Sequence, residues 1–212
     1  GSSIVHLHIG EGVYNIVYTG DFKYGRTTLL EPAVTEFPRV ETIITESTYG
    51  APQDIMPSRT EAEQRLATII NETLSMHGKV LIPVPAVGRA QEIMLVLNHL
   101  FSTGMIPEVP VFLDGLVIEA TAIHTAFPSY LGRELGGRIE ELGNVFMSEY
   151  FTAVRSQQQR DDILNMEGPM IIMATSGMLE GGPILTYLRE FASDDRNMLI
   201  FVSYQVEGTL GR

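Results

Sequence analysis

The chain has 212 residues, of which 44% are hydrophobic, and this is long enough for one large or two small packed domains. It contains no cysteine, which excludes disulfides and thiolate metal sites, so any metal must be held by His and carboxylate groups. The 14 basic and 26 acidic side chains give a formal net charge of -12, which repels polyanions at long range. A nucleic acid would therefore have to be bound locally, and a solvated surface is the simplest explanation of the acidity.

The chain shows no sign of a membrane or export segment. Its longest apolar runs fall well short of the roughly 20 residues that a transmembrane helix needs, and no charged-then-apolar leader opens it. We therefore expect a cytoplasmic protein with no membrane partner.

The first part of the chain, up to about residue 46, has the pattern of β-strands. The run SIVHLHIG alternates His6 and His8 with apolar neighbours, which is the period of two of a half-buried strand. The run VYNIVYTG follows the short turn GEG and predicts a hairpin with the first strand. A connection punctuated by Pro32 and Pro38 then leads to the apolar run VETIITE.

From Ser58 onward the pattern changes to alternating helices and strands. Ser58 and Glu61 have the spacing of a capping box, and apolar residues then recur at helical spacing up to Gly78. The expected elements after this helix are, in order, KVLIPV, GRAQEIMLVLNHLF, VPVFLDG, LVIEATAIHTAF, NVFMSE, SQQQRDDILNM, PMIIMAT, PILTYLREFA and NMLIFVSYQ. Apolar strands separated by helices predict an α/β fold with a parallel sheet covered by helices on both faces.

Unusual residues collect where these strands end. The strands lead into PAVGRAQE, into Asp114, into SGMLEGG and into VEGTLGR, and ligands of open parallel sheets bind beyond the carboxyl ends of strands. Glycines there let backbone N–H groups approach an oxyanion, so a phosphate-bearing ligand is the simplest inference. Single turns of this kind also occur for geometric reasons, and no dinucleotide or ATP motif is present. Arg89 opposes the dipole at its helix start, which favours contact with a ligand or pairing with Glu92.

Two acids end the strands of the first part, Asp21 in TGD and Glu46 in ITES. As hard oxygen donors they could ligate a metal that activates water. As structural groups they could accept hydrogen bonds from turn N–H groups. Their spacing does not decide between these two interpretations. His6 and His8 look like a metal pair, but no acid or third His stands beside them, so we interpret them as strand-face residues.

Six motifs, taken together and in order, resemble the β-CASP family of the metallo-β-lactamase superfamily, and within it the archaeal homologues of the nuclease subunit of the cleavage and polyadenylation specificity factor (CPSF). They are TGD (19–21), ESTYG (46–50), PVPAVGRAQE (83–92), LDGLVIEATAIHTAFPSYL (113–131), SGMLEGGP (176–183) and FVSYQVEGTLGR (201–212). The resemblance implies part of a strand-rich metallo-β-lactamase αββα domain at residues 1–50, a Rossmann-like β-CASP domain at 51–204, and a return segment at 205–212.

The resemblance also implies chemistry. Family members use two zinc ions to activate a water that attacks an RNA phosphodiester, and the β-CASP domain caps that site. Asp21 resembles the acid that bridges both metals, and Glu46 the acid that orients a ligand His and assists proton transfer. RNA phosphates would be met by Arg89 and by two turns, Ser47-Thr48-Tyr49 and Ser176-Gly177-Met178. RNA is the implied partner, and a homodimer of the whole protein is allowed.

The departures from the family pattern limit what this chain can do. The ligand motif His-x-His-x-Asp-His is absent, and VHLHIG does not supply it. We therefore expect a piece of a longer zinc-dependent ribonuclease of RNA 3′-end processing or archaeal transcription termination, in which this piece alone binds zinc weakly and does not cleave RNA. Two alternatives stay open: a non-catalytic scaffold subunit of a 3′-end processing complex, and an ordinary α/β domain that binds a small phosphate metabolite.

Overall fold

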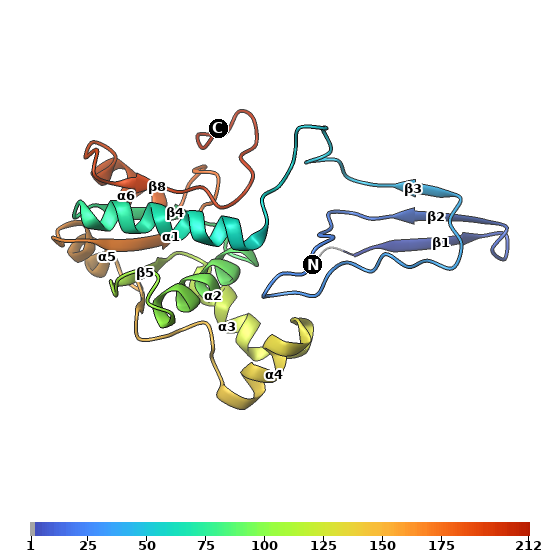
Figure 1. Cartoon of the computed structure of the whole chain (residues 1–212), viewed down its shortest axis with the longest axis horizontal. Helices are drawn as coiled ribbons and strands as arrows, with labels where there is room; N and C mark the ends of the chain where they lie inside the picture. The colour runs from blue at the N-terminus through green and yellow to red at the C-terminus, as the bar shows by residue number, and fades with distance from the viewer. Residues whose placement is uncertain (1–2) are drawn as a thin grey trace. The chain divides into compact units, whose positions relative to one another are not determined.

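A computed structural model describes residues 3–212 and separates into two compact units, up to Ser58 and from Arg59 to Arg212 (Figure 1). Each unit is described by itself. No helix among the described residues is both long enough and apolar enough to cross a bilayer.

The first unit is a three-stranded sheet. Strands β1 (Val5–Ile9) and β2 (Tyr14–Tyr18) form the predicted antiparallel hairpin. Strand β3 (Thr42–Ile44) lies within the predicted run VETIITE and pairs with β2 in parallel, which puts β2 in the centre. A parallel pair needs a long crossover, and the Pro-rich stretch between β2 and β3 provides it.

The two faces of this sheet differ in how far they are covered. The crossover packs against the face that carries His6 and Asn15, where the ring of Phe37 lies 5.5 Å from that of His6 and Val17 is completely buried. The opposite face carries large apolar side chains that remain 43–52% exposed, namely Val5, Leu7, Ile9, Tyr14, Tyr18 and Ile44. An apolar sheet face of this extent is normally covered by another layer.

The second unit contains a parallel sheet of five strands in the order β6-β5-β7-β4-β8. The strands are β4 (Lys79–Pro83), β5 (Val111–Asp114), β6 (Phe151–Ala153), β7 (Met170–Ala174) and β8 (Met198–Leu199). The helices are α1 (Arg59–Ser75), α2 (Arg89–Ser102), α3 (Val117–Ala126), α4 (Arg133–Leu142), α5 (Gln157–Leu164) and α6 (Ile184–Phe191), with a 3₁₀ turn η1 (Pro128–Tyr130).

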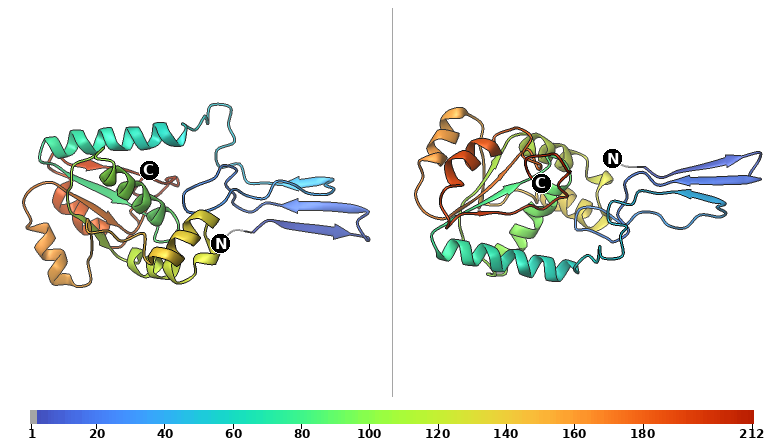
Figure 2. Two further views of the ribbon diagram at one scale, coloured as in Figure 1. Left: turned by 60° about the horizontal axis from the view of Figure 1, so that its bottom comes forward. Right: turned by 90° about the horizontal axis from the view of Figure 1, so that it is seen from above.

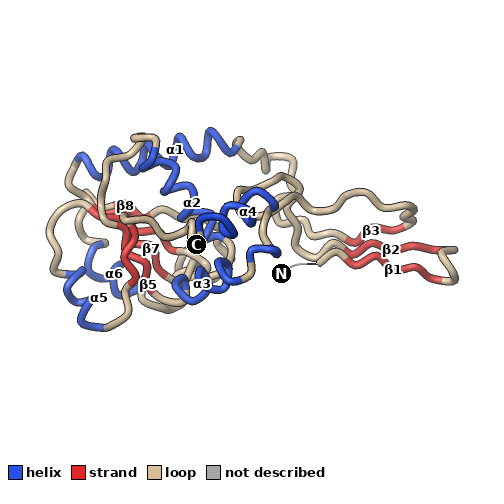
Figure 3. The backbone as a smooth tube through the Cα atoms, turned by 90° about the horizontal axis from the view of Figure 1, so that it is seen from below, coloured by secondary structure: helices blue, strands red, loops and turns tan. Residues whose placement is uncertain are grey.

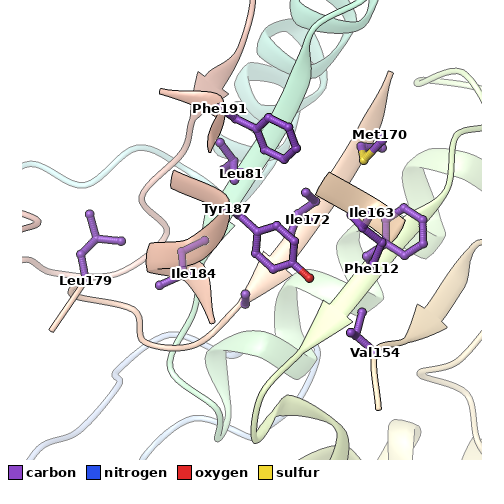
Figure 4. Packing of buried hydrophobic residues seen from close by; sticks show 11 residues of the cluster. Leu81, Phe112, Val154, Ile163, Met170, Ile172, Leu179, Ile184, Tyr187 and Phe191 are labelled. Carbon is purple, nitrogen blue, oxygen red and sulfur yellow. The ribbon is translucent and has the colours of Figure 1, made fainter. Parts of the chain in front are cut away.

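Helices cover both faces of this sheet, as the sequence predicts. Helices α1 and α2 lie on one side, and α5 and α6 lie on the other (Figures 2 and 3). The α5 and α6 side buries a continuous apolar cluster that includes Leu81, Phe112 and Ile172 from three adjacent strands and Tyr187 from α6 (Figure 4). These strands are buried on both faces, which explains why their sequences are apolar runs and not alternating patterns.

Some details differ from the sequence expectations. Helix α4 was not anticipated, because Gly136 and Gly137 interrupt its apolar pattern. The run NVFMSE forms no strand, and β6 follows it at Phe151–Ala153. The last predicted strand, NMLIFVSYQ, is reduced to Met198–Leu199, and the residues after it are irregular.

Candidate functional site

Asp21 and Glu46 follow neighbouring strands of the first unit. Tyr18 of β2 lies opposite Ile44 of β3, and the pairing continues one step further because the Thr19 N–H donates to the Ile44 carbonyl at 3.0 Å. Asp21 and Glu46 come shortly after this paired point, each beyond the carboxyl end of its strand. The sheet therefore brings the two predicted acids to the same edge, although they are distant in sequence.

Glu46 has a structural role in the turn that follows it. Its Oε2 accepts a hydrogen bond of 2.7 Å from the Thr48 N–H, and the Gly50 N–H closes the turn on the Ser47 carbonyl at 3.0 Å. This contact is the turn-capping role that the sequence left open as one alternative. It leaves Oε1 outside the turn contact, so the geometry is compatible with a second role for the same carboxylate. Tyr49 at the tip of the turn is about half exposed.

The described residues do not form a zinc site by themselves. No group of three or more His, Asp or Glu side chains within residues 3–212 is arranged to hold a metal. His6 and His8 lie on the covered sheet face, where His6 Nε2 bonds the Arg39 carbonyl and His8 Nδ1 bonds Asn15 Oδ1. Zinc sites in proteins use three or four ligands with His among them, so the carboxylates here do not suffice.

The ends of β4 and β7 form a topological switch point of the second unit. These strands are neighbours, but β4 leads into α2 on one side of the sheet and β7 leads into α6 on the other (Figure 3). In doubly wound sheets, ligands bind where adjacent connections diverge in this way. The loop after β4 carries Arg89, and the loop after β7 carries Ser176, Gly177 and Met178. The fold therefore places both predicted phosphate-binding segments of this unit at one topological switch point.

The two loops touch each other closely. A Cβ atom on Gly177 would lie 2.6 Å from the Pro85 ring, which is closer than real side-chain contacts, so only glycine fits there. Gln91, which is completely buried, holds the loop after β4 through two hydrogen bonds. Gln91 Oε1 accepts from the Gly88 N–H at 2.7 Å, and its Nε2 donates to the Ala86 carbonyl at 3.1 Å. Both loops are thus fixed in place without a ligand.

Arg89 is exposed and forms no salt bridge with any described residue. The sequence left two explanations for this Arg, a ligand or pairing with Glu92. The carboxylate of Glu92 lies 3.6 Å from Arg59 instead, so the structure does not support the pairing. A cation that opposes the start of α2 without an internal partner is available to bind an anion.

Two backbone N–H groups of the loop after β7, one in the buried Gly177 and one in the partly buried Met178, have no acceptor among the described residues. The carbonyl and hydroxyl oxygens of Ser176 accept the N–H groups of Leu179 and Glu180, at 3.3 and 3.0 Å. The N–H groups of Gly177 and Met178 donate to no acceptor within the described residues. Successive free N–H groups are an arrangement that binds phosphate oxygens, and Arg89 follows the loop that Gly177 contacts at Pro85.

Asp114 ends β5 but does not belong to the exposed part of this site. It is almost completely buried, and its two oxygens accept hydrogen bonds from Arg160 Nε at 2.7 Å and Arg160 Nη2 at 2.8 Å. The Tyr187 hydroxyl also donates to it at 2.8 Å. Burial raises the pKa of Tyr187, and the bond to Asp114 raises it further. The same bond raises the pKa of Arg160. Asp114 therefore joins β5, α5 and α6 as a structural group.

Sequence reasoning missed three residues that shape these loops, Gln91, Arg160 and Gln205. Gln205 Nε2 donates to the Gly177 carbonyl at 3.0 Å. Gln205 and Arg160 act through partners that are distant in sequence, so no periodicity marks them. Gln91 instead bonds the N–H of Gly88, three residues earlier at the start of α2. The available signal for Gln91 was a polar residue three positions after Gly88, in the first turn of the otherwise apolar helix α2.

Known proteins resemble the chain over this same region. A family model described as the Beta-Casp domain matches residues 90–212, which is more than half of the chain and includes the loop after β7. The chain belongs to the Beta-Casp family. The five-stranded parallel sheet with helices on both faces is consistent with a Beta-Casp domain.

Similar proteins in archaea carry one printed name, transcription termination factor FttA. The relative from Lokiarchaeum sp. is 58% identical over 212 residues, that from Methanocaldococcus jannaschii 54% over 213, and that from Thermococcus kodakarensis 55% over 213. In each case the match covers 100% of this chain and 33% of the relative. The Beta-Casp chain thus spans about a third of the length of these relatives.

Proposed function

We propose that the chain is the RNA-binding β-CASP portion of a longer, metal-dependent endoribonuclease that acts in RNA 3′-end processing and archaeal transcription termination. The observation that carries this proposal is the pair of free N–H groups of Gly177 and Met178 beside the loop with Arg89 at the β4/β7 switch point. Relatives at 54–58% identity named transcription termination factor support the setting.

We expect this site to contact the phosphates of the RNA backbone. Arg89 supplies a charge and the two N–H groups supply directed donors, and all three suit phosphate oxygens better than base edges. We therefore expect affinity without sequence preference from this site. Ser176 is a further candidate, because its hydroxyl can still donate while its oxygen accepts from Glu180.

The first unit is proposed to be part of a metallo-β-lactamase domain. Its sheet exposes an apolar face that needs a further layer, and the relatives are about three times as long as this chain. In the longer protein Asp21 would be a metal ligand and Glu46 would assist proton transfer, while His ligands for two zinc ions would come from other parts of that protein. The described residues alone do not fit zinc.

The test of RNA binding uses the full-length protein. Arg89→Ala should weaken binding of a single-stranded RNA and reduce the slope of log K against log salt by about one, because one phosphate contact is lost. Arg65→Ala is the matched control, because Arg65 is an exposed arginine on α1 and its substitution removes the same charge. Equal effects of the two variants would show general electrostatics and would contradict a site at the switch point.

The metal assignment has its own test. Zinc should bind tightly to the full-length protein and at most weakly to these 212 residues, and Asp21→Asn should reduce both zinc content and RNA cleavage in the full-length protein. Calorimetry that showed tight, stoichiometric zinc binding by the 212-residue chain would overturn this assignment. RNA binding by a full-length protein that holds no zinc and cleaves nothing would instead establish the scaffold alternative.

A further inference from the structure

The last residues of the chain lie against the loop after β7. Gln205 Nε2 donates to the Gly177 carbonyl at 3.0 Å, the Gly211 N–H to the Met178 carbonyl at 3.2 Å, and the Leu210 N–H to Glu180 Oε1 at 2.9 Å. We call residues 205–211 the C-terminal strap. Its three contacts fall on consecutive parts of the loop that carries the two free N–H groups.

Peptide geometry links the strap to the candidate phosphate site. The carbonyl of Gly177 and the N–H of Met178 belong to one planar peptide, and in a trans peptide they point in opposite directions. Gln205 binds that carbonyl, so it also directs the Met178 N–H to the side away from the strap. One side-chain amide therefore fixes the direction of one of the two donors.

The position of Gln205 is itself tightly constrained. A Cβ atom on Gly211 would lie 1.9 Å from Gln205 Oε1, so any side chain at position 211 would displace the Gln205 amide. The Oε1 atom is buried and, among the described residues, has no hydrogen-bond partner. A buried unpaired acceptor is unfavourable for stability. Gln205 therefore contributes to the fold through its Nε2 group, which donates to the carbonyls of Gly177, Ser203 and Tyr204.

We propose that Gln205 is a positioning residue for RNA binding, which holds the Gly177–Met178 peptide so that the Met178 N–H meets a phosphate oxygen. Gly211 makes room for it. This inference rests on the proposed function, because it assigns a role within the same phosphate site. Gln205 does not touch the RNA itself.

The first experiment removes the amide and keeps the length of the side chain. In the full-length protein, Gln205→Met should weaken binding of single-stranded RNA about tenfold, because the Met178 N–H is no longer held in place and its hydrogen bond to the charged phosphate is lost. The salt slope should stay unchanged because no charge is removed, in contrast to Arg89→Ala. In cleavage assays KM should rise with kcat unchanged, as expected for lost ground-state binding. Gln158→Met, at an exposed glutamine of α5, is the matched control and should behave as wild type.

A second experiment tests the coupling and does not depend on one variant alone. Gly211→Ala should weaken binding by a similar factor, because it displaces Gln205. In a Gln205→Ala background the same change should have little further effect, so the two effects should not add. Additive effects would overturn the positioning role. Melting temperatures of all variants show whether a loss of binding reflects unfolding.

The two proposals fail in different ways. If Arg89→Ala weakens RNA binding while Gln205→Met binds as wild type, the positioning role is wrong and the phosphate site stands. If neither variant weakens binding, the phosphate site itself is wrong. If Gln205→Met also lowers the salt slope, a charged contact has been lost and the positioning role is contradicted.

Discussion

Removal of the Arg160 guanidinium should strongly destabilise the second unit, because the buried Asp114 carboxylate loses its ionic partner. Asp114 is 2% exposed at its side chain, and Arg160 is its bidentate partner at 2.7 and 2.8 Å. In Arg160→Met the aliphatic stem remains, but the carboxylate of Asp114 is left buried, and within residues 3–212 the Tyr187 hydroxyl is then its one side-chain donor. The cost arises from an uncompensated buried charge and not from lost packing.

The magnitude follows from the burial of the two partners. Removal of one partner of a buried ion pair costs about 3–5 kcal/mol. The Arg160 side chain is 21% exposed, so water screens part of the pair and we expect about 3 kcal/mol. Tyr187→Phe removes one hydrogen bond to a charged group, which is worth about 1.5 kcal/mol, and leaves the ion pair intact. Arg160→Met should therefore cost about twice as much as Tyr187→Phe.

A triple variant separates a buried charge from lost contacts. With Asp114→Val, Arg160→Met and Tyr187→Phe together, no charge or hydroxyl remains unpaired, and apolar replacement of a buried pair is often nearly neutral. The triple variant should be at least about 2 kcal/mol more stable than Arg160→Met alone. All described helices lie in the second unit, so urea unfolding followed by the helical circular dichroism signal reports on it. A triple variant as unstable as Arg160→Met would refute the reasoning.

Three further outcomes are expected. Gly78→Ala should cost about 1–3 kcal/mol in urea unfolding, because its Cβ would lie 2.0 Å from the carbonyl oxygen of Arg196. The hydrogen bonds from Arg196 lower the pKa of Asp194 to about 2. The stabilisation from this pair is therefore present above the ordinary carboxyl pKa and is lost as the pH falls toward 2. NMR titration of the Arg196→Gln variant should show the pKa of Asp194 rising toward its usual value. The Asn15 side chain is the main cause of the lowered pKa of Glu41, so NMR titration of Asn15→Ala should show the Glu41 pKa rising.

The fold was largely predictable because its signals are local. Helix α1 and strands β4 and β7 have clear periodicity or continuous apolar runs, and Gly78 separates α1 from β4. The sequence pattern does not predict helix α4, because the stability of this helix does not come from the helix propensity of its residues. Gly136 lies in its middle at a point where a Cβ would be 2.8 Å from the Pro128 carbonyl, so close packing against η1 overrides the local cost of glycine. The strand order likewise depends on pairings between distant segments, which no local pattern encodes.

The sequence predicts which turns could form the candidate site, but it does not predict the residues that hold those turns in place. Glycine-rich turns at strand ends and the mismatch of Arg89 with the helix dipole indicated where a phosphate could bind. The groups that hold these turns in place could not be found in the same way. Gln205 contacts a carbonyl 28 positions earlier, and Arg160 contacts a carboxylate 46 positions earlier. Both contacts exist only because the parallel sheet brings successive strand ends to one edge.

An acidic chain can still bind RNA if the proposed site uses backbone N–H groups as its hydrogen-bond donors. A net charge of -12 lowers the local concentration of RNA, so a site built from arginines alone would have to overcome that repulsion with many cations. Backbone N–H groups act at contact distance and add no net charge, so they can hold a phosphate that long-range electrostatics does not attract. Such donors are only as good as their orientation, because a hydrogen bond weakens steeply with angle. In the proposed site we therefore expect the residues that fix the peptide planes, Gln91 at one loop and Gln205 at the other, to contribute as much to binding as the cation Arg89.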